Sequence, residues 1–143
     1  MLKEEILTEK AMRILSALGF PEAELSLLFV DDEAMREINL EYRNADKSTN
    51  VLAFAMNEGE FSDINPELLG DVVISTETAL KEAREWEMNP DVRITQLMVH
   101  GILHLVGFDH EKGPDAEAEM EVKSTELVRM LENNEQLAGW LDP

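Results

Sequence analysis

Apolar residues recur along the chain at two different spacings, and each spacing predicts a different kind of element. From Leu2 to Leu18 they fall three or four positions apart, which is the period of an amphipathic helix, and Gly19 with Pro21 then ends the pattern. Residues 24–30 (E-L-S-L-L-F-V) are instead densely apolar over the length of a strand. The chain is therefore predicted to begin with a helix that leads into a strand.

A second amphipathic helix is predicted to follow this strand. Asp31 or Asp32 can serve as its N-cap, because a short carboxylate side chain can accept a hydrogen bond from the first helical turn. The polar stretch of residues 43–50 (R-N-A-D-K-S-T-N) is typical of a loop that leads into the next strand. The buried face of the helix is predicted to consist of Ala34, Met35, Ile38 and Tyr42.

Two more strands and a third helix are predicted in the middle of the chain. Residues 51–56 and 70–75 have the composition and length of strands. Residues 57–69 between them lack a clear period and are predicted to form an irregular loop. Ser75 or Thr76 is then suited to cap the third helix.

The last two helices differ sharply in polarity. Residues 92–106 are apolar on most sides, as expected for a helix buried in the core, and Pro90 separates them from the preceding helix. Pro114 and Asp115 begin a very acidic final helix. The inward side of that helix is predicted to carry Met120, Leu127, Val128 and Leu131.

All three histidines of the chain lie within this buried helix and the turn that follows it. Their spacing, H-x-x-x-H-x-x-G-x-x-H, places His100 and His104 on one helical face, since four residues are just over one turn. Gly107 can adopt the left-handed conformation that ends a helix, so the chain can turn back and bring His110 to the same point. Three converging imidazoles leave a fourth position for water, which is the arrangement of a catalytic zinc site.

Two other interpretations of these histidines are weaker. A single histidine on an apolar helix is usually a core residue with satisfied hydrogen bonds, but three at a ligand spacing within one short window are improbable by chance. A structural metal site would usually add a fourth ligand, often Cys, and the chain contains no Cys. The sequence therefore predicts one divalent metal ion held by His100, His104 and His110. Zinc is preferred, although nickel, copper or iron also accept imidazole ligands.

The same spacing occurs in zinc endopeptidases, whose signature is H-E-x-x-H-x-x-G-x-x-H. In those enzymes the glutamate after the first histidine is the general base, and this chain has Gly101 there. The ligand spacing is kept while the proton acceptor is lost, which disfavours a peptidase. The expected fold is α/β or α+β and zincin-like: a small mixed sheet of three to four strands covered by helices, with the metal-ligand helix buried among them.

Composition bounds the remaining possibilities. A chain of 143 residues is most simply a single domain, residues 1–143, with one core. No apolar run approaches the ~20 residues of a membrane span, and the N-terminus M-L-K-E-E is too acidic for a secretory signal. Together with the absence of Cys, these features predict a cytoplasmic protein that contacts no membrane.

The acidic charge limits how the chain could bind nucleic acid. Lys and Arg total 12 against 31 Asp and Glu, which gives a formal net charge of −19. Binding to phosphate backbones normally draws on many Lys and Arg contacts. Contact with a polyanion would therefore have to be local, in a cleft with its own positive field, or be brought about by a partner. Much of the acidic excess could equally serve solubility alone.

Four further residues could contribute to a site. Arg43 and Lys47 stand in the polar loop, where a guanidinium could hold a phosphate bidentately. The residues alone favour the plainer alternative, a solvated loop in which Arg43 pairs with one of many carboxylates. Asp71 and Asp109 could each orient a ligand imidazole by accepting its second N–H, or could be ordinary turn or cap residues.

Three ordered blocks of the chain match the motifs of one known family. Residues 100–110 (H-G-I-L-H-L-V-G-F-D-H) are similar to H-G-x-L-H-L-x-G-[YF]-D-H. Residues 38–54 (I-N-L-E-Y-R-N-A-D-K-S-T-N-V-L-A-F) are similar to L-N-x-x-Y-R-x-x-D-x-P-T-D-V-L-S-F, and residues 69–74 (L-G-D-V-V-I) to L-G-D-[IV]-x-I. Together the blocks resemble the YbeY family, the bacterial endoribonucleases of rRNA maturation.

The resemblance implies a single-strand-type, metal-dependent endoribonuclease. It implies that His100, His104 and His110 hold a zinc-like metal and that Arg43 lies beside it, so Arg43 and His104 become the expected catalytic residues. It further implies processing of the 3′ end of small-subunit rRNA and ribosome quality control. The expected partners are rRNA, the small ribosomal subunit and ribosomal proteins, with no DNA.

Some positions depart from the family pattern, and two other functions stay open. Ser48, Asn50 and Ala53 replace the family's Pro, Asp and Ser, changes that are expected to soften the loop and the strand edge. One alternative is a metallohydrolase acting on a non-RNA substrate, such as a peptide or small ester. The other is a ribosome-associated binding factor with a mainly structural metal, whose acidic surface docks basic ribosomal proteins.

Overall fold

The computed structural model describes residues 4–56, 68–107 and 114–132, and three strands and five helices lie within these ranges. The alternation of helices and strands confirms the mixed α+β fold class with a small sheet. The strands are β1 (Glu24–Val30), β2 (Val51–Ala55) and β3 (Leu68–Ser75), and the helices are α1 (Glu4–Ala17), α2 (Asp32–Arg43), α3 (Thr76–Glu85), α4 (Pro90–Leu105) and α5 (Pro114–Glu132).

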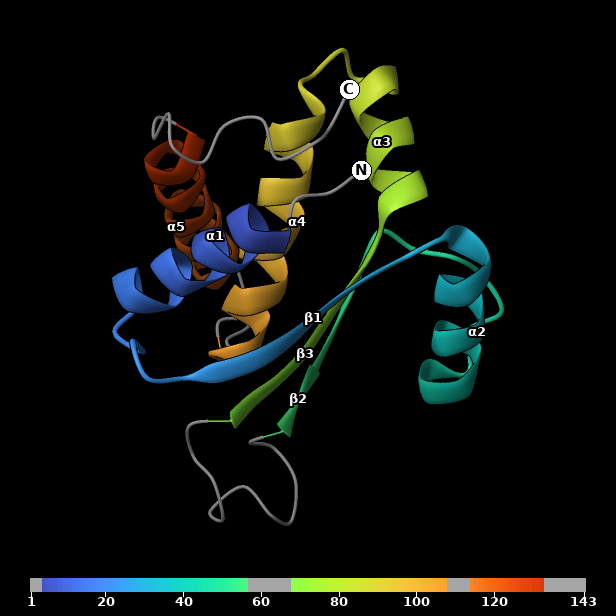
Figure 1. Ribbon diagram of the computed structural model, residues 1–143, viewed down its shortest axis with the longest axis horizontal. Coiled ribbons are helices and arrows are strands. Elements are labelled where there is room, and N and C mark those ends of the chain that lie inside the picture. Colours follow the sequence, from blue (N-terminus) through green and yellow to red (C-terminus); the bar gives the residue numbers. More distant parts are fainter. Residues whose placement is uncertain (1–3, 57–67, 108–113, 133–143) are drawn as a thin grey trace.

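The sheet is mixed, with strand order β1-β3-β2. β3 is paired in parallel with β1 and antiparallel with β2, so β2 is an edge strand in the described part of the chain. Figure 1 shows the sheet between α2 on one side and α1, α4 and α5 on the other. β3 begins at Leu68, two residues before the predicted start, because Leu68 pairs with Glu24 of β1.

Side chains along β3 alternate between two apolar layers, as the period of a strand requires. Val72 and Ile74 belong to the larger core, which α1, α4 and α5 complete. Val73 faces the opposite side and packs with Met35 of α2 and Leu52 of β2 in a smaller cluster. No helix in the described ranges combines the length and apolarity needed to cross a membrane.

The helix that carries the two described histidines, α4, is largely buried, as its apolar sequence predicts. It contacts β2, β3 and the helices α1, α3 and α5. It begins at Pro90 rather than at residue 92, because Asn89 caps it by accepting a hydrogen bond from the Asp91 N–H at 2.8 Å. Proline is well suited to this first position, where a helical N–H has no partner in the helix.

Gly101 lets α4 approach the sheet closely. A Cβ atom at this position would lie 2.6 Å from Cγ1 of Val72 and 3.4 Å from Cγ2 of Val51. A side chain at residue 101 would therefore require β3 or α4 to move. Close packing explains why the position of the peptidase glutamate carries no side chain in this protein.

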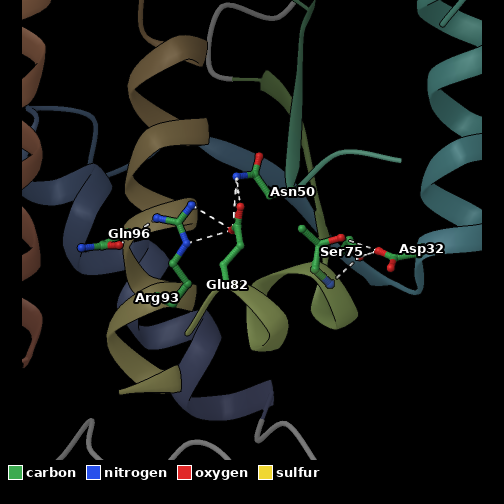
Figure 2. A network of polar contacts seen from close by, with 7 residues as sticks. Asp32, Asn50, Ser75, Glu82, Arg93 and Gln96 are labelled. Atoms are coloured by element: carbon green, nitrogen blue, oxygen red, sulfur yellow. Dashed lines mark hydrogen bonds and ion pairs between the residues drawn. The ribbon is translucent and has the colours of Figure 1, made fainter. Parts of the chain in front are cut away.

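Helix α2 is anchored by a carboxylate that bonds to three hydroxyl groups. Asp32 Oδ1 accepts a hydrogen bond from Ser75 at 2.5 Å (Figure 2). It also accepts hydrogen bonds from Thr78 at 2.5 Å and from Ser48 at 3.1 Å. The hydrogen bonds from Ser75 and then Thr78 lower the pKa of Asp32 from its ordinary value, because they stabilise the ionised form. Ser48 thus anchors the loop that its substitution for proline was expected to soften.

A buried lysine joins three helices on the other side of the sheet. Lys10 of α1 donates to Thr95 of α4 at 2.8 Å and to a carboxylate oxygen of Glu132, in α5, at 3.1 Å. Thr95 donates to the same oxygen at 2.5 Å. These contacts link the helices that enclose the larger core, where Lys10 is fully buried.

The prediction that Tyr42 lies on the buried face of α2 is wrong, because its side chain is 65% exposed. Met35 is fully buried as expected, and Ala34 and Ile38 are half-buried. Tyr42 lies in the last turn of α2, where its ring contacts Phe54 of β2 edge-on, with the centroids 5.5 Å apart.

Candidate active site

Arg43 is the last residue of α2, and not a loop residue as the sequence predicted. Asn44 follows in the left-handed conformation (φ 57°), and its N–H bonds to the Leu40 carbonyl at 3.1 Å, which ends the helix. Buried Asn39 then holds the next segment by donating from Nδ2 to the Lys47 carbonyl at 2.9 Å. The backbone on both sides of Arg43 is therefore held in place by hydrogen bonds.

The guanidinium of Arg43 bonds to the backbone of the edge strand. Its Nη2 donates to the Ala53 carbonyl at 3.1 Å, and its Cζ lies 5.4 Å from the centroid of the Phe54 ring. The nearby loop carboxylate, Asp46, pairs instead with Arg36 at 2.6 Å. Among the residues that the structure describes, no carboxylate forms an ion pair with Arg43, contrary to the plainer alternative.

His100 and His104 project from the same face of α4, as their spacing predicts. Their Nε2 atoms are 3.0 Å apart, and their ring centroids are separated by 4.5 Å. Two imidazoles that bind one zinc tetrahedrally at Zn–N distances of 2.0–2.1 Å would place these atoms about 3.3 Å apart. The pair therefore fits a shared cation, and it equally fits a hydrogen bond in which one Nε2–H donates to the other ring.

The third predicted ligand, His110, lies outside the described residues, as does Asp109. Gly107 has a φ of 101° and its N–H bonds to the His104 carbonyl at 3.1 Å, so α4 ends with the conformation predicted for this glycine. Within the described ranges, no three His, Cys, Asp or Glu side chains are grouped as a metal site would require. Two of the three proposed ligands can thus be placed.

Arg43 and the two histidines meet in one pocket of about 280 Å³ between the edge strand β2 and α4. The chain brings them together through topology, because α2 and α4 lie on opposite faces of the sheet and Arg43 reaches around its edge. Lys47 is exposed and does not line this pocket. Among the histidines that the structure describes, neither His100 nor His104 forms a hydrogen bond with Asp71 of β3. The pocket is lined by Arg43, Val51, Leu52, Ala53, His100, Gly101 and His104.

A second pocket, of about 750 Å³, continues from His100 and Val51 along α4 towards α5. Its arginine on α4, Arg93, forms an ion pair with Glu82 of α3 at 2.9 Å, so that charge is balanced within the protein. Figure 2 shows Asn50 directed at the same carboxylate, with which it forms hydrogen bonds at 3.3 and 3.4 Å. An aspartate at position 50, as in the family pattern, would instead place a second negative charge beside Glu82.

Sequence reasoning missed two features of the site. Asn39, which fixes the segment after Arg43, could have been noticed as a polar residue four positions after Met35 on the buried face of an amphipathic helix. The contact between Tyr42 and Phe54 had no signal, because it depends on where the edge strand lies relative to the end of α2.

Known proteins share both the sequence and the fold of this chain. The family model described as Endoribonuclease YbeY matches residues 2–132. Proteins named Endoribonuclease YbeY from Geobacter metallireducens and Aquifex aeolicus are 49% identical over 127 residues and 50% identical over 103 residues. These alignments cover 88% and 72% of this chain, and 85% and 67% of the relatives.

The fold is similar to the solution structure of TM1509 from Thermotoga maritima, with a TM-score of 0.65 and 22% sequence identity. That comparison covers 98% of this chain and 85% of the other. It supports the mixed α+β architecture, while the family model and the sequence relatives carry the family assignment. The family match spans the helix end with Arg43, the edge strand and the histidine helix. The chain therefore belongs to the YbeY family of endoribonucleases.

Proposed function

We propose that this protein is a metal-dependent endoribonuclease of the cytoplasm that cleaves single-stranded rRNA. Its role would be maturation of the 3′ end of small-subunit rRNA and ribosome quality control, in contact with the small subunit and its proteins. The observation that carries the proposal is one pocket lined both by two histidines of α4 and by an arginine without a carboxylate partner among the described residues. Family membership supports the reaction class.

The metal site would be formed by His100, His104 and His110. The 3.0 Å separation of the two described Nε2 atoms fits such a site, and three neutral imidazoles are a donor set suited to Zn²⁺. The bound ion would supply Lewis-acid chemistry towards a phosphate oxygen and a water molecule.

Arg43 would stabilise the negative charge that develops on the phosphoryl group. Its bond to the Ala53 carbonyl uses one of five guanidinium N–H groups and fixes the side chain at the pocket, so other N–H groups can meet two phosphate oxygens. This arrangement is preorganised because a backbone carbonyl on the strand determines where the charge lies. A lysine would keep the charge but lose the planar fork.

Gly101 leaves residue 101 without a proton acceptor, and the packing of α4 on Val72 excludes a larger side chain there. This favours phosphodiester chemistry over the peptidase mechanism, in which a glutamate at that position is the general base. The imidazoles of His100 and His104 would both serve as ligands of the proposed metal.

Cleavage of an rRNA precursor by purified variants tests the proposal. His104→Ala should abolish cleavage, and Arg43→Ala should lower kcat/KM by about 100-fold, the usual loss when one preorganised donor to a developing charge is removed. Arg36→Ala is the matched control, since Arg36 is on the same helix but pairs with exposed Asp46. Removal of the metal by a chelator should abolish cleavage, and Zn²⁺ should restore it.

Undiminished cleavage by His104→Ala would show that a contaminating nuclease is responsible and would overturn the proposal. A folded His104→Ala protein that cleaves no RNA and yet supports ribosome maturation in cells would favour the alternative of a binding factor. Activity of the metal-loaded protein on peptides or esters, without activity on RNA, would favour the other metallohydrolase.

A further inference from the structure

An exposed aromatic pair adjoins Arg43 at the end of α2. Tyr42 is 65% exposed, and its ring meets the half-buried ring of Phe54 with the centroids 5.5 Å apart and the planes at 60°. The guanidinium carbon of Arg43 lies 5.4 Å from the centroid of the Phe54 ring. One phenylalanine thus contacts both the exposed tyrosine and the cation of the proposed active site.

The position of Tyr42 is fixed although its surface is exposed. Phe54 packs against the small core cluster that contains Met35 and Leu52, so the ring that supports Tyr42 is itself anchored. Tyr42 also belongs to the last turn of α2, which the bonds of Asn44 and Asn39 hold in place. Held aromatic rings lose little conformational freedom when a ligand binds, which favours their use in recognition.

We infer that Tyr42 and Phe54 form a stacking platform for an unpaired base of the RNA, adjacent to the phosphate that Arg43 holds. This inference rests on the proposed function and deepens it by assigning a base-binding site. Single-stranded RNA is generally bound by stacking its bases on aromatic side chains, which accept any base because every base has a π-face. In a duplex those faces are covered by neighbouring base pairs, so the platform would select single strands.

The charge of the protein favours a base over other occupants of this surface. At a net charge of −19, the chain has few cations with which to hold a phosphate backbone, and stacking supplies affinity without any. The platform is also continuous with the pocket, since Arg43 lines the pocket and contacts Phe54. A base stacked there would belong to a nucleotide next to the one at the histidines.

Steady-state kinetics on a short single-stranded RNA, with the Zn²⁺-loaded protein, tests the platform. Tyr42→Leu should raise KM about five-fold or more, the loss expected for one stacking contact, with a smaller change in kcat. Tyr42→Phe keeps the ring and should stay within about two-fold of the wild type. Phe20→Leu removes another partly exposed aromatic ring, outside the platform, and should leave KM unchanged.

A substrate series with one abasic nucleotide, moved stepwise along the RNA, gives an independent readout. One abasic position should raise the KM of the wild type by about the factor seen for Tyr42→Leu, and should cause no further rise in that variant, because the base and the ring act as one pair. Circular dichroism and thermal unfolding of each variant control for folding, which an exposed ring should affect little.

Unchanged KM in folded Tyr42→Leu would overturn the platform, and so would equal abasic penalties in the variant and the wild type at every position. In both cases cleavage by the wild type would leave the proposed endoribonuclease intact. A wild-type protein that cleaves no RNA, with metal bound, would overturn the proposed function and the platform together.

Discussion

Gly101 is the residue at which packing and chemistry compete most directly. In the peptidases that share the histidine spacing, this position carries the glutamate that acts as the general base. Here a Cβ would approach Val72 Cγ1 to 2.6 Å, and Val72 is fully buried and β-branched, so it has little freedom to turn away. The missing acceptor is therefore a consequence of how closely α4 lies on β3.

Gly101→Ala should consequently destabilise the protein, although alanine is the better helix former. The helix gains about 1 kcal/mol from the replacement of glycine, whereas overpacking of a tight core costs roughly 1–3 kcal/mol. We expect the free energy of unfolding to fall by up to about 2 kcal/mol, as measured by urea denaturation. The same substitution in a Val72→Ala background removes the clash and should be neutral or stabilising. Stabilisation by Gly101→Ala in the wild-type background would show that the helix has room to shift.

At the scale of single residues, the sequence predicted best where local spacing decides the outcome. The four-residue interval of His100 and His104 places both on one helical face wherever that helix packs. Tyr42 was assigned to the wrong environment because a helical period marks a face but not where the neighbouring sheet ends. The environment of Arg43 depends on both the end of α2 and the edge strand β2, and no local sequence pattern indicates how far apart these two elements lie.

At the scale of elements, the helices around the larger core are joined by a polar contact within an apolar layer. Lys10 lies on the α1 face that also buries Leu7, Ala11 and Ile14, so the apolar stripe contains a charge. Its partners come from the middle of α4 and the end of α5. The sequence contained a signal for this contact, since a lysine interrupts the stripe. The identity of its partners requires the fold.

Lys10→Met should cost more than an exposed ion pair on the same helix. The substitution keeps much of the side-chain volume but removes the cation that Glu132 faces in a region where Glu132 is only 20% exposed. We expect the free energy of unfolding to fall by about 2–3 kcal/mol. This is towards the lower end of the cost of breaking a buried ion pair, because water can reach the carboxylate. Arg13→Met is the matched control, since its pair with Glu9 is well exposed, and it should cost less than about 1 kcal/mol. If urea denaturation gave the same loss of unfolding free energy for Lys10→Met and Arg13→Met, Lys10 would stabilise the fold through the packing of its side chain and not through its ion pair.

At the scale of the whole molecule, the sequence indicated the fold class but not the strand order. Apolar composition over the length of a strand identified β1, β2 and β3, yet such a segment does not say which strands pair. The order β1-β3-β2 makes β2 an edge strand in the described part of the chain, and at this edge Arg43 of α2 lines one pocket with the histidines of α4. The site could be predicted as a set of residues, whereas its assembly required the topology.

The distribution of charge over the whole molecule leads to a prediction about salt, which rests on the proposed endoribonuclease activity. Each phosphate contact with a single-stranded nucleic acid contributes about −0.7 to the slope of log affinity against log salt concentration. Three arginines line the two pockets: Arg43, Arg93 and Arg129. Arg93 is neutralised by its ion pair with Glu82, whereas Arg43 and Arg129 form no ion pair within the described residues.

One or two contacts would give a slope of about −0.7 to −1.4, and screening of the repulsion between RNA and the net charge of −19 acts in the opposite direction. The KM for a short single-stranded RNA should therefore rise less than about ten-fold between 50 and 200 mM KCl. Over roughly the same change in salt concentration, a protein with 6–10 phosphate contacts loses 10³–10⁵ in affinity. Arg43→Ala should flatten the dependence further, and Arg36→Ala should not change it. A steep loss in the wild type would mean that many cations hold the backbone, contrary to a site in which one arginine and a stacked base position the RNA.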